Sequence, residues 1–309
     1  MTPGVPPRLP LLSQRLVVVT GKGGVGKTTV TAALAYAAAA SERRVLAVEV
    51  GRGSLGSLLG GIHLGTEPMR VRAGLAAASL EPEALLGDFV GGVLRFRVLA
   101  RRLLESTSFQ VLAAAAPGLG EFLVLHRLLG WVEARRGRRP LHDVVIVDAP
   151  ASGHSLPLLA APHTLGALAR LGPVAELLAR LQRLIGDPGA TLVCVVTTPE
   201  ELAVRETVEL HRELGERLGL AVAPPIVNAL PPRRFTAGDV AALDHLEAAS
   251  GPHAYLDAAR FQLERRRQAD AQLTTLRRAV GAAPSARRSA VSWASACRRR
   301  SSWKRAAWR

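Results

Sequence analysis

The stretch that decides the fold runs from Leu16 to Thr29 and reads L-V-V-V-T-G-K-G-G-V-G-K-T-T. An apolar run leads into a glycine-rich loop, and an alanine-rich helical segment follows. Glycines let backbone N–H groups turn inward, and the start of a helix adds free N–H groups and a positive dipole end. Strand, loop and helix in this order predict a phosphate-binding loop of the G-x-x-x-x-G-K-[ST] pattern.

Residues of this loop have separate predicted tasks. Lys27 is expected to reach the β- and γ-phosphates of ATP, and the Thr28 hydroxyl is expected to ligate Mg²⁺. The other nucleotide-binding residues predicted in the loop are Gly21, Gly23, Gly24, Val25, Gly26 and Thr29.

A second apolar run, Val144 to Val147, ends in the carboxylate of Asp148. A carboxylate at the end of a strand beside a phosphate loop is placed to hold Mg²⁺ through water. The run therefore predicts the second half of a magnesium–nucleotide site, with Thr28 and Asp148 as its metal-side residues.

Strand-like apolar runs alternate with longer helical segments, which predicts an α/β fold with a doubly wound, mainly parallel sheet. The runs are continuous in Val, Ile and Leu, as is typical of strands buried on both faces. The predicted strands are Arg15–Thr20, Arg44–Val50, Leu75–Leu80, Asp143–Asp148, Thr191–Thr197 and Ala221–Asn228.

We expect one P-loop ATPase domain over residues 1–275, with a helical insertion over about 52–140. Within that interval, Gly92–Glu105 and Leu119–Arg135 carry apolar residues at helical spacing. Ordinary crossover helices that cover the sheet are the alternative interpretation. Residues 276–309 are expected to form a basic tail.

This tail differs from the rest of the chain. It has no acidic residue, and three of the four tryptophans lie in it. The ten Lys and Arg from Arg277 to Arg309 account for most of the formal net charge of +15 and leave +5 for the rest. The tail is either a disordered segment that binds nucleic acid or anionic lipid, or a stretch translated out of frame.

Composition narrows the class of protein. The two cysteines form no C-x-x-C pair, which excludes a zinc clasp or redox motif of that kind. No apolar run reaches the roughly 18 residues of a spanning helix, so no transmembrane segment is expected. Residues 1–10 show no signal-like apolar stretch. A cytoplasmic protein is expected, with peripheral membrane contact left open.

Two motifs together carry a family resemblance. Lys22 opens the loop as K-G-G-V-G-K-T-T, and residues 148–156 read D-A-P-A-S-G-H-S-L. The chain resembles the arsenical-pump and tail-anchored-protein-targeting ATPases, a SIMIBI-class family. The resemblance implies ATP and Mg²⁺ as cofactors and a dimer, homomeric or formed with a paralogue, in which Lys22 acts on the partner's nucleotide. It also implies that Gly153 senses the γ-phosphate, that Pro199 lies in the adenine-side loop, and that Asn228 reads the adenine edge.

Some family features are missing. Gly51 stands where the family places the Asp that orients the attacking water, and Glu49 lies two residues earlier. Hydrolysis is then expected to be slow, or to use Glu49 or a partner subunit. The cysteines that bind arsenite are missing, and the two methionines cannot form a Met-rich groove. The client stays open: a hydrophobic segment or a membrane-associated protein.

We expect a nucleotide-switched ATPase with Lys22, Lys27, Glu49 and Asp148 as its catalytic residues. Two alternatives stay open. A positioning or partition ATPase on DNA or membrane shares the loop but needs a basic or amphipathic surface, and nucleic acid is not the expected partner. A non-hydrolysing ATP-binding regulatory subunit is favoured by Gly51.

Overall fold

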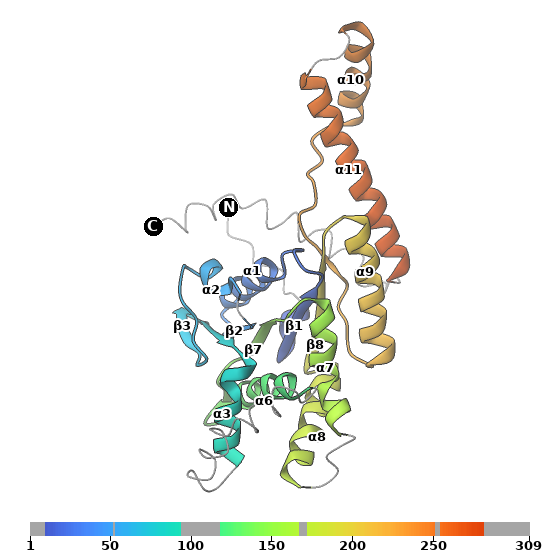
Figure 1. Ribbon diagram of the computed structural model, residues 1–309. Coiled ribbons are helices and arrows are strands. Elements are labelled where there is room, and N and C mark those ends of the chain that lie inside the picture. Colours follow the sequence, from blue (N-terminus) through green and yellow to red (C-terminus); the bar gives the residue numbers. More distant parts are fainter. Residues whose placement is uncertain (1–9, 52, 94–117, 167–171, 251–253, 281–309) are drawn as a thin grey trace.

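The computed structural model describes residues 10–51, 53–93, 118–166, 172–250 and 254–280 (Figure 1). Its centre is a seven-stranded sheet in the order β3-β4-β2-β7-β1-β8-β9, parallel except for the β3–β4 pair. The strands are β1 Leu16–Gly21, β2 Val45–Val50, β3 Met69–Arg72, β4 Leu75–Leu80, β7 Val144–Asp148, β8 Thr191–Thr197 and β9 Ile226–Val227. The predicted α/β class with a mainly parallel sheet is confirmed.

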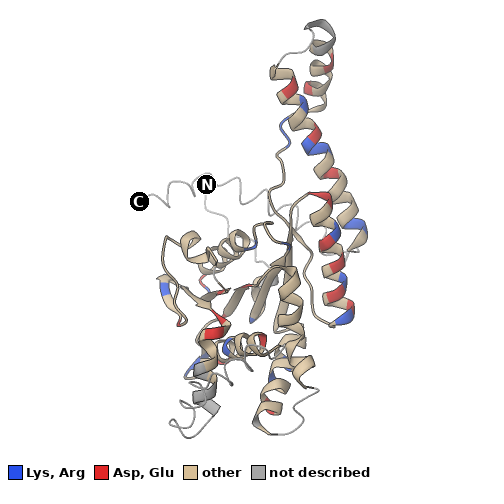
Figure 2. Cartoon of the chain, in the orientation of Figure 1, with Lys and Arg blue, Asp and Glu red and all other residues tan. Residues whose placement is uncertain are grey.

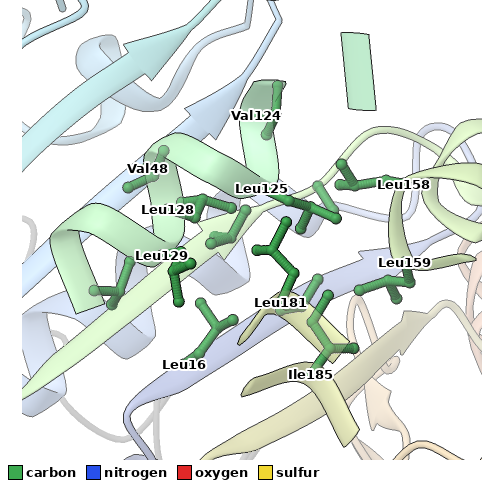
Figure 3. Close-up of a cluster of buried hydrophobic side chains, with 14 of the residues drawn as sticks. Leu16, Val48, Val124, Leu125, Leu128, Leu129, Leu158, Leu159, Leu181 and Ile185 are labelled. Atoms are coloured by element: carbon green, nitrogen blue, oxygen red, sulfur yellow. The ribbon is translucent and has the colours of Figure 1, made fainter. Parts of the chain in front are cut away.

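Helices cover both faces of the sheet. Successive strand residues point to opposite sides, and both sides carry apolar residues that the helices bury. On one side α1 (Lys27–Ala40) and α2 (Leu55–Leu58) pack over a cluster that includes Val17, Val19 and Ile146. On the other side α3 (Pro82–Val93), α6 (Leu119–Glu133), α7 (Ser152–Gly166) and α8 (Pro173–Gly186) cover a cluster built on the alternate strand residues. Figure 3 shows leucines of α6, α7 and α8 meeting Leu16 and Val48 of the sheet.

One strand is shorter in the structure than predicted, and several short strands were not predicted. The strand expected over Ala221–Asn228 is reduced to β9, with an isolated bridge from Val222 to Val193. Pro224 and Pro225 lie between them and lack the N–H groups that a ladder needs. Edge strand β3 was not predicted from the sequence. The hairpin of β5 (Arg135–Arg136) and β6 (Arg139–Pro140) was not predicted either.

The interval 52–140 contains strands as well as helices. Strand β4 pairs in parallel with β2 along its whole length, so this interval supplies part of the main sheet. Helix α6 packs on the sheet, as the crossover interpretation expects. Of the helical segment predicted over Gly92–Glu105, only the first two residues are described, at the end of α3. The domain division itself stays a prediction.

The carboxyl-terminal part of the described chain is helical. A short 3-10 turn, Pro10–Ser13, precedes the sheet, and α9 (Glu201–Arg212) continues into a π-helical turn, Glu213–Arg217. Helices α10 (Ala237–Ser250) and α11 (Ala254–Ala279) then form an arm that projects away from the sheet (Figure 1). The base of α11 packs on α9 through Leu273 and Leu276. Leu276 is therefore buried in the described fold.

Every helix in the described ranges is too short or too polar to cross a membrane.

Candidate nucleotide-binding site

The glycine-rich loop lies between β1 and α1, at the carboxyl edge of the sheet. Its backbone needs glycine at several positions. Gly24 and Gly26 have φ values of 81° and 87°, in the left-handed region. A Cβ on Gly21 would lie 2.2 Å from the Val196 carbonyl oxygen of neighbouring strand β8. Gly23 and Thr29 are exposed, whereas the Val25 side chain is buried.

Lys27, Thr28 and Asp148 come together at this edge, because β1 and β7 pair in parallel with Val19 opposite Asp148. Lys27 Nζ donates to the Lys22 carbonyl oxygen at 3.1 Å. Burial raises the pKa of Asp148, while hydrogen bonds from Thr28 and Thr31 and the charge of Lys27 oppose that shift. Burial also lowers the pKa of Lys27, against the attraction of Asp148. The charged forms of Lys27 and Asp148 therefore stabilise each other.

These residues fit a magnesium nucleotide. Thr28 and Asp148 offer neighbouring oxygen ligands, which Mg²⁺ prefers. Within the described ranges no cluster of three or more His, Cys, Asp or Glu could hold a metal. Mg²⁺ commonly takes only one or two protein ligands and completes its shell with phosphate oxygens and water.

Glu49 lies beside Asp148 but already has a partner. The two residues are opposite each other on β2 and β7, and Glu49 is 5% exposed. Glu49 Oε1 accepts the Leu55 backbone N–H at 2.8 Å, and a Cβ on Gly53 would lie 2.1 Å from that oxygen. Burial raises the pKa of Glu49; this N–H lowers it, and the nearby Asp148 raises it further. Glu49 therefore holds the loop that follows β2.

Gly51 starts that loop. Its φ is 85°, its N–H donates to Leu80 and its carbonyl accepts from the Ser79 hydroxyl. The left-handed backbone favours glycine at this position. The position at which an Asp was expected is therefore a left-handed turn that favours glycine.

Three other predicted residues lie at the same carboxyl edge of the sheet. Asn228 Nδ2 donates to the Val25 carbonyl at 3.0 Å, and a Cβ on Gly26 would lie 2.3 Å from it. Pro199 follows β8 and Gly153 lies in the first turn of α7, where backbone N–H groups lack helical acceptors. Among the described residues, no hydrogen bond joins Pro199 or Gly153 to the loop. Of the three, Asn228 is the residue that hydrogen-bonds to the loop.

Glu206 contacts the loop lysine Lys22 and was not predicted from the sequence. Lys22 Nζ lies 2.7 Å from Glu206 Oε1 on α9, and both side chains are about one-third exposed. The two residues are 184 positions apart, and no local pattern links them. The structure thus shows Lys22 held by a carboxylate of its own chain. Thr31, which donates to Asp148 Oδ1 at 3.3 Å, was also missed.

A parallel α/β sheet with a phosphate loop after one strand and a carboxylate ending its neighbour defines a P-loop nucleotide-binding protein. The family follows from comparison with known proteins. A match to the anion-transporting ATPase family covers residues 14–172. The chain belongs to this family, and the predicted family resemblance is confirmed.

Individual relatives agree with this assignment. The chain is 31% identical over 234 residues to ATPase BagA of Mycobacterium tuberculosis, covering 74% of this chain and 68% of the relative. It is 26% identical over 263 residues to ATPase GET3 of Kluyveromyces lactis, covering 74% of this chain and 75% of the relative.

Proposed function

We propose that this protein hydrolyses Mg-ATP as a nucleotide-switched dimer, formed by two copies or with a paralogue. The observation that supports this most is the assembly of Lys27, Thr28 and Asp148 at one edge of the sheet, with Lys22 at the rim of the loop. In this proposal, Lys27 and the loop N–H groups hold the phosphates, and Asp148 orients the metal shell. Bound Mg²⁺ would neutralise phosphate charge that develops during the reaction.

Lys22 provides a test of the dimer. It is expected to act on the partner's nucleotide, so Lys22→Ala should lower turnover by about a hundredfold or more. ATP affinity should stay near that of the wild type, because Lys27 and the loop backbone remain. Steady-state phosphate release and calorimetric ATP binding measure the two effects separately.

Arg205→Ala is a matched control, since Arg205 is an exposed cation on α9 beside Glu206. It should leave both measurements unchanged. Full turnover by Lys22→Ala would remove the trans role, and parallel loss of ATP binding would make Lys22 an ordinary loop residue.

Glu206 restrains Lys22 in the resting chain, and this restraint has a measurable consequence. The pair must open before Lys22 can reach a partner, and an exposed pair of this kind contributes about 0.2–1 kcal/mol. Glu206→Gln should therefore raise turnover at limiting protein concentration by up to about fivefold. Turnover measured over a protein dilution series would show the half-maximal point moving to lower concentration.

Glu209→Gln on the same helix is the control, because Glu209 is exposed and its substitution removes the same charge. A fall in turnover for Glu206→Gln alone would contradict the restraint. It would mean that Glu206 instead positions Lys22 in the closed state.

A second candidate function, an ATP-binding regulatory subunit, is supported by Gly51 and Glu49. The loop after β2 offers glycine where a carboxylate is expected, and Glu49 is engaged by the Leu55 N–H. Without a group to orient water, the site would bind ATP and hydrolyse it slowly. Turnover that rises strongly only when a paralogous subunit is added would support this candidate. Fast turnover by the purified chain alone, unchanged by a paralogue, would exclude it.

A further inference from the structure

The short hairpin of β5 and β6 crowds four arginines into one turn. Arg135, Arg136, Arg138 and Arg139 are all exposed. Arg136 and Arg139 are direct cross-strand partners, and like charges in that position destabilise a sheet. In the part of the chain that the structure describes, none of the four guanidinium groups has a carboxylate partner. We name this group the arginine hairpin.

The backbone holds these charges together despite their repulsion. Gly137 has a φ of 62°, which suits the first central position of a tight hairpin turn. Arg135 donates through its side chain to the Arg138 carbonyl at 3.3 Å, and the Leu141 N–H donates to the Ala134 carbonyl at 2.7 Å. The turn therefore keeps four cationic residues close together in sequence and space, and an anion bound among them would relieve their repulsion.

More arginines lie next to the hairpin. Arg15 donates to the carbonyls of His142 and Val132, and Arg43 donates to that of Asp143. Burial lowers the pKa of Arg15; Asp143 opposes that shift, and the positive charges of Arg135, Arg43 and Arg44 add to it. Asp143 is itself paired with Arg44. The positive field of the hairpin therefore continues onto the body of the protein.

The cluster lies opposite the nucleotide site. The hairpin precedes β7, so it is at the amino ends of the parallel strands, whereas the phosphate loop follows the carboxyl end of β1. An anionic partner could bind there while the nucleotide edge stays open. Helices α9 and α11 do not form such a cationic surface, because Figure 2 shows residues of both charge signs along them.

We propose that the arginine hairpin docks this protein on an anionic lipid bilayer, with its guanidinium groups on headgroup phosphates and Leu141 at the interface. Leu141 directly follows the hairpin and is 44% exposed, which suits an interface that is polar on one side and apolar on the other. Residues 134–141 contain no aromatic side chain on which a nucleic-acid base could stack. These two features favour lipid over nucleic acid.

A fluorescent label reports the contact directly. In the full chain with Cys297→Ser, a nitrobenzoxadiazole label is attached at Leu141→Cys or at Leu202→Cys. Leu202 is similarly exposed, at 48%, and starts α9 at the opposite edge of the sheet. Vesicles of phosphatidylcholine with phosphatidylglycerol should shift the emission at position 141 to the blue and leave position 202 unchanged. Phosphatidylcholine alone should shift neither.

Charge removal identifies the groups responsible. Replacing the four hairpin arginines by Gln should weaken vesicle binding, followed through the label at position 141, by about a hundredfold or more. Each basic residue near the surface contributes about fivefold to the affinity. The matched control replaces four exposed arginines elsewhere by Gln: Arg234, Arg267, Arg277 and Arg278. It makes the same change in net charge and should keep most of the binding.

The outcomes separate the interpretations. Equal loss in both quadruple variants would show a general charge effect and overturn the proposal, as would a hairpin variant that binds normally. A shift at position 141 with a DNA duplex but not with vesicles would assign the surface to nucleic acid instead. Circular dichroism checks that the hairpin variant is folded. Nucleotide is left out, so the result does not depend on the proposed ATPase function.

Discussion

Replacing Lys27 with alanine is expected to lower Mg-ATP turnover by about a thousandfold or more and to weaken ATP binding. Lys27 Nζ contacts the Lys22 carbonyl and lies near the buried Asp148 carboxylate, in the loop that would surround the phosphates. Without the Lys27 ammonium group, the negative charge of the β- and γ-phosphates is no longer neutralised inside the site. Steady-state phosphate release by wild type and variant measures the loss.

The wild-type rate decides how this result is interpreted. Wild-type turnover that disappears with Lys27 would establish a self-sufficient ATPase and direct attention to its client. Tight ATP binding without turnover in the wild type would point to Gly51 and to a hydrolytic partner subunit. Turnover that survives Lys27→Ala would have to come from a contaminating enzyme or from another site, and would contradict the proposed function.

Leu128→Ala is expected to destabilise the fold by about 2–5 kcal/mol. Leu128 is 1% exposed and lies on α6, against the sheet in the cluster of Figure 3. Truncation removes buried apolar contacts and leaves a cavity, because α6 is held between strands and helices that cannot collapse fully. The thermal unfolding midpoint should fall by roughly 5 °C or more.

Leu202→Ala is the matched control, since Leu202 is a helical leucine that is 48% exposed. Its expected change in unfolding free energy is within about 0.5 kcal/mol. Equal shifts in the midpoint for the two variants would mean that α6 does not belong to the stabilising core.

Much of the candidate site could be predicted from local sequence. The loop from Gly21 to Thr29 needs glycines, a lysine and a hydroxyl at set spacings, and those needs are visible without a fold. Asp148 was visible for a similar reason, as a carboxylate that ends an apolar run. Periodicity was less informative where backbone chemistry intervened, as at Pro224 and Pro225, which shorten β9.

What the sequence by itself determined is the class of protein and the phosphate loop, because these follow from conformational preferences of neighbouring residues. Only the tertiary structure decided which distant groups meet. It brought Glu206 to Lys22, Asn228 to the Val25 carbonyl and Arg136 opposite Arg139. Such pairings depend on strand order, register and helix packing. These arise from the whole hydrophobic core, so no short segment of the chain specifies them.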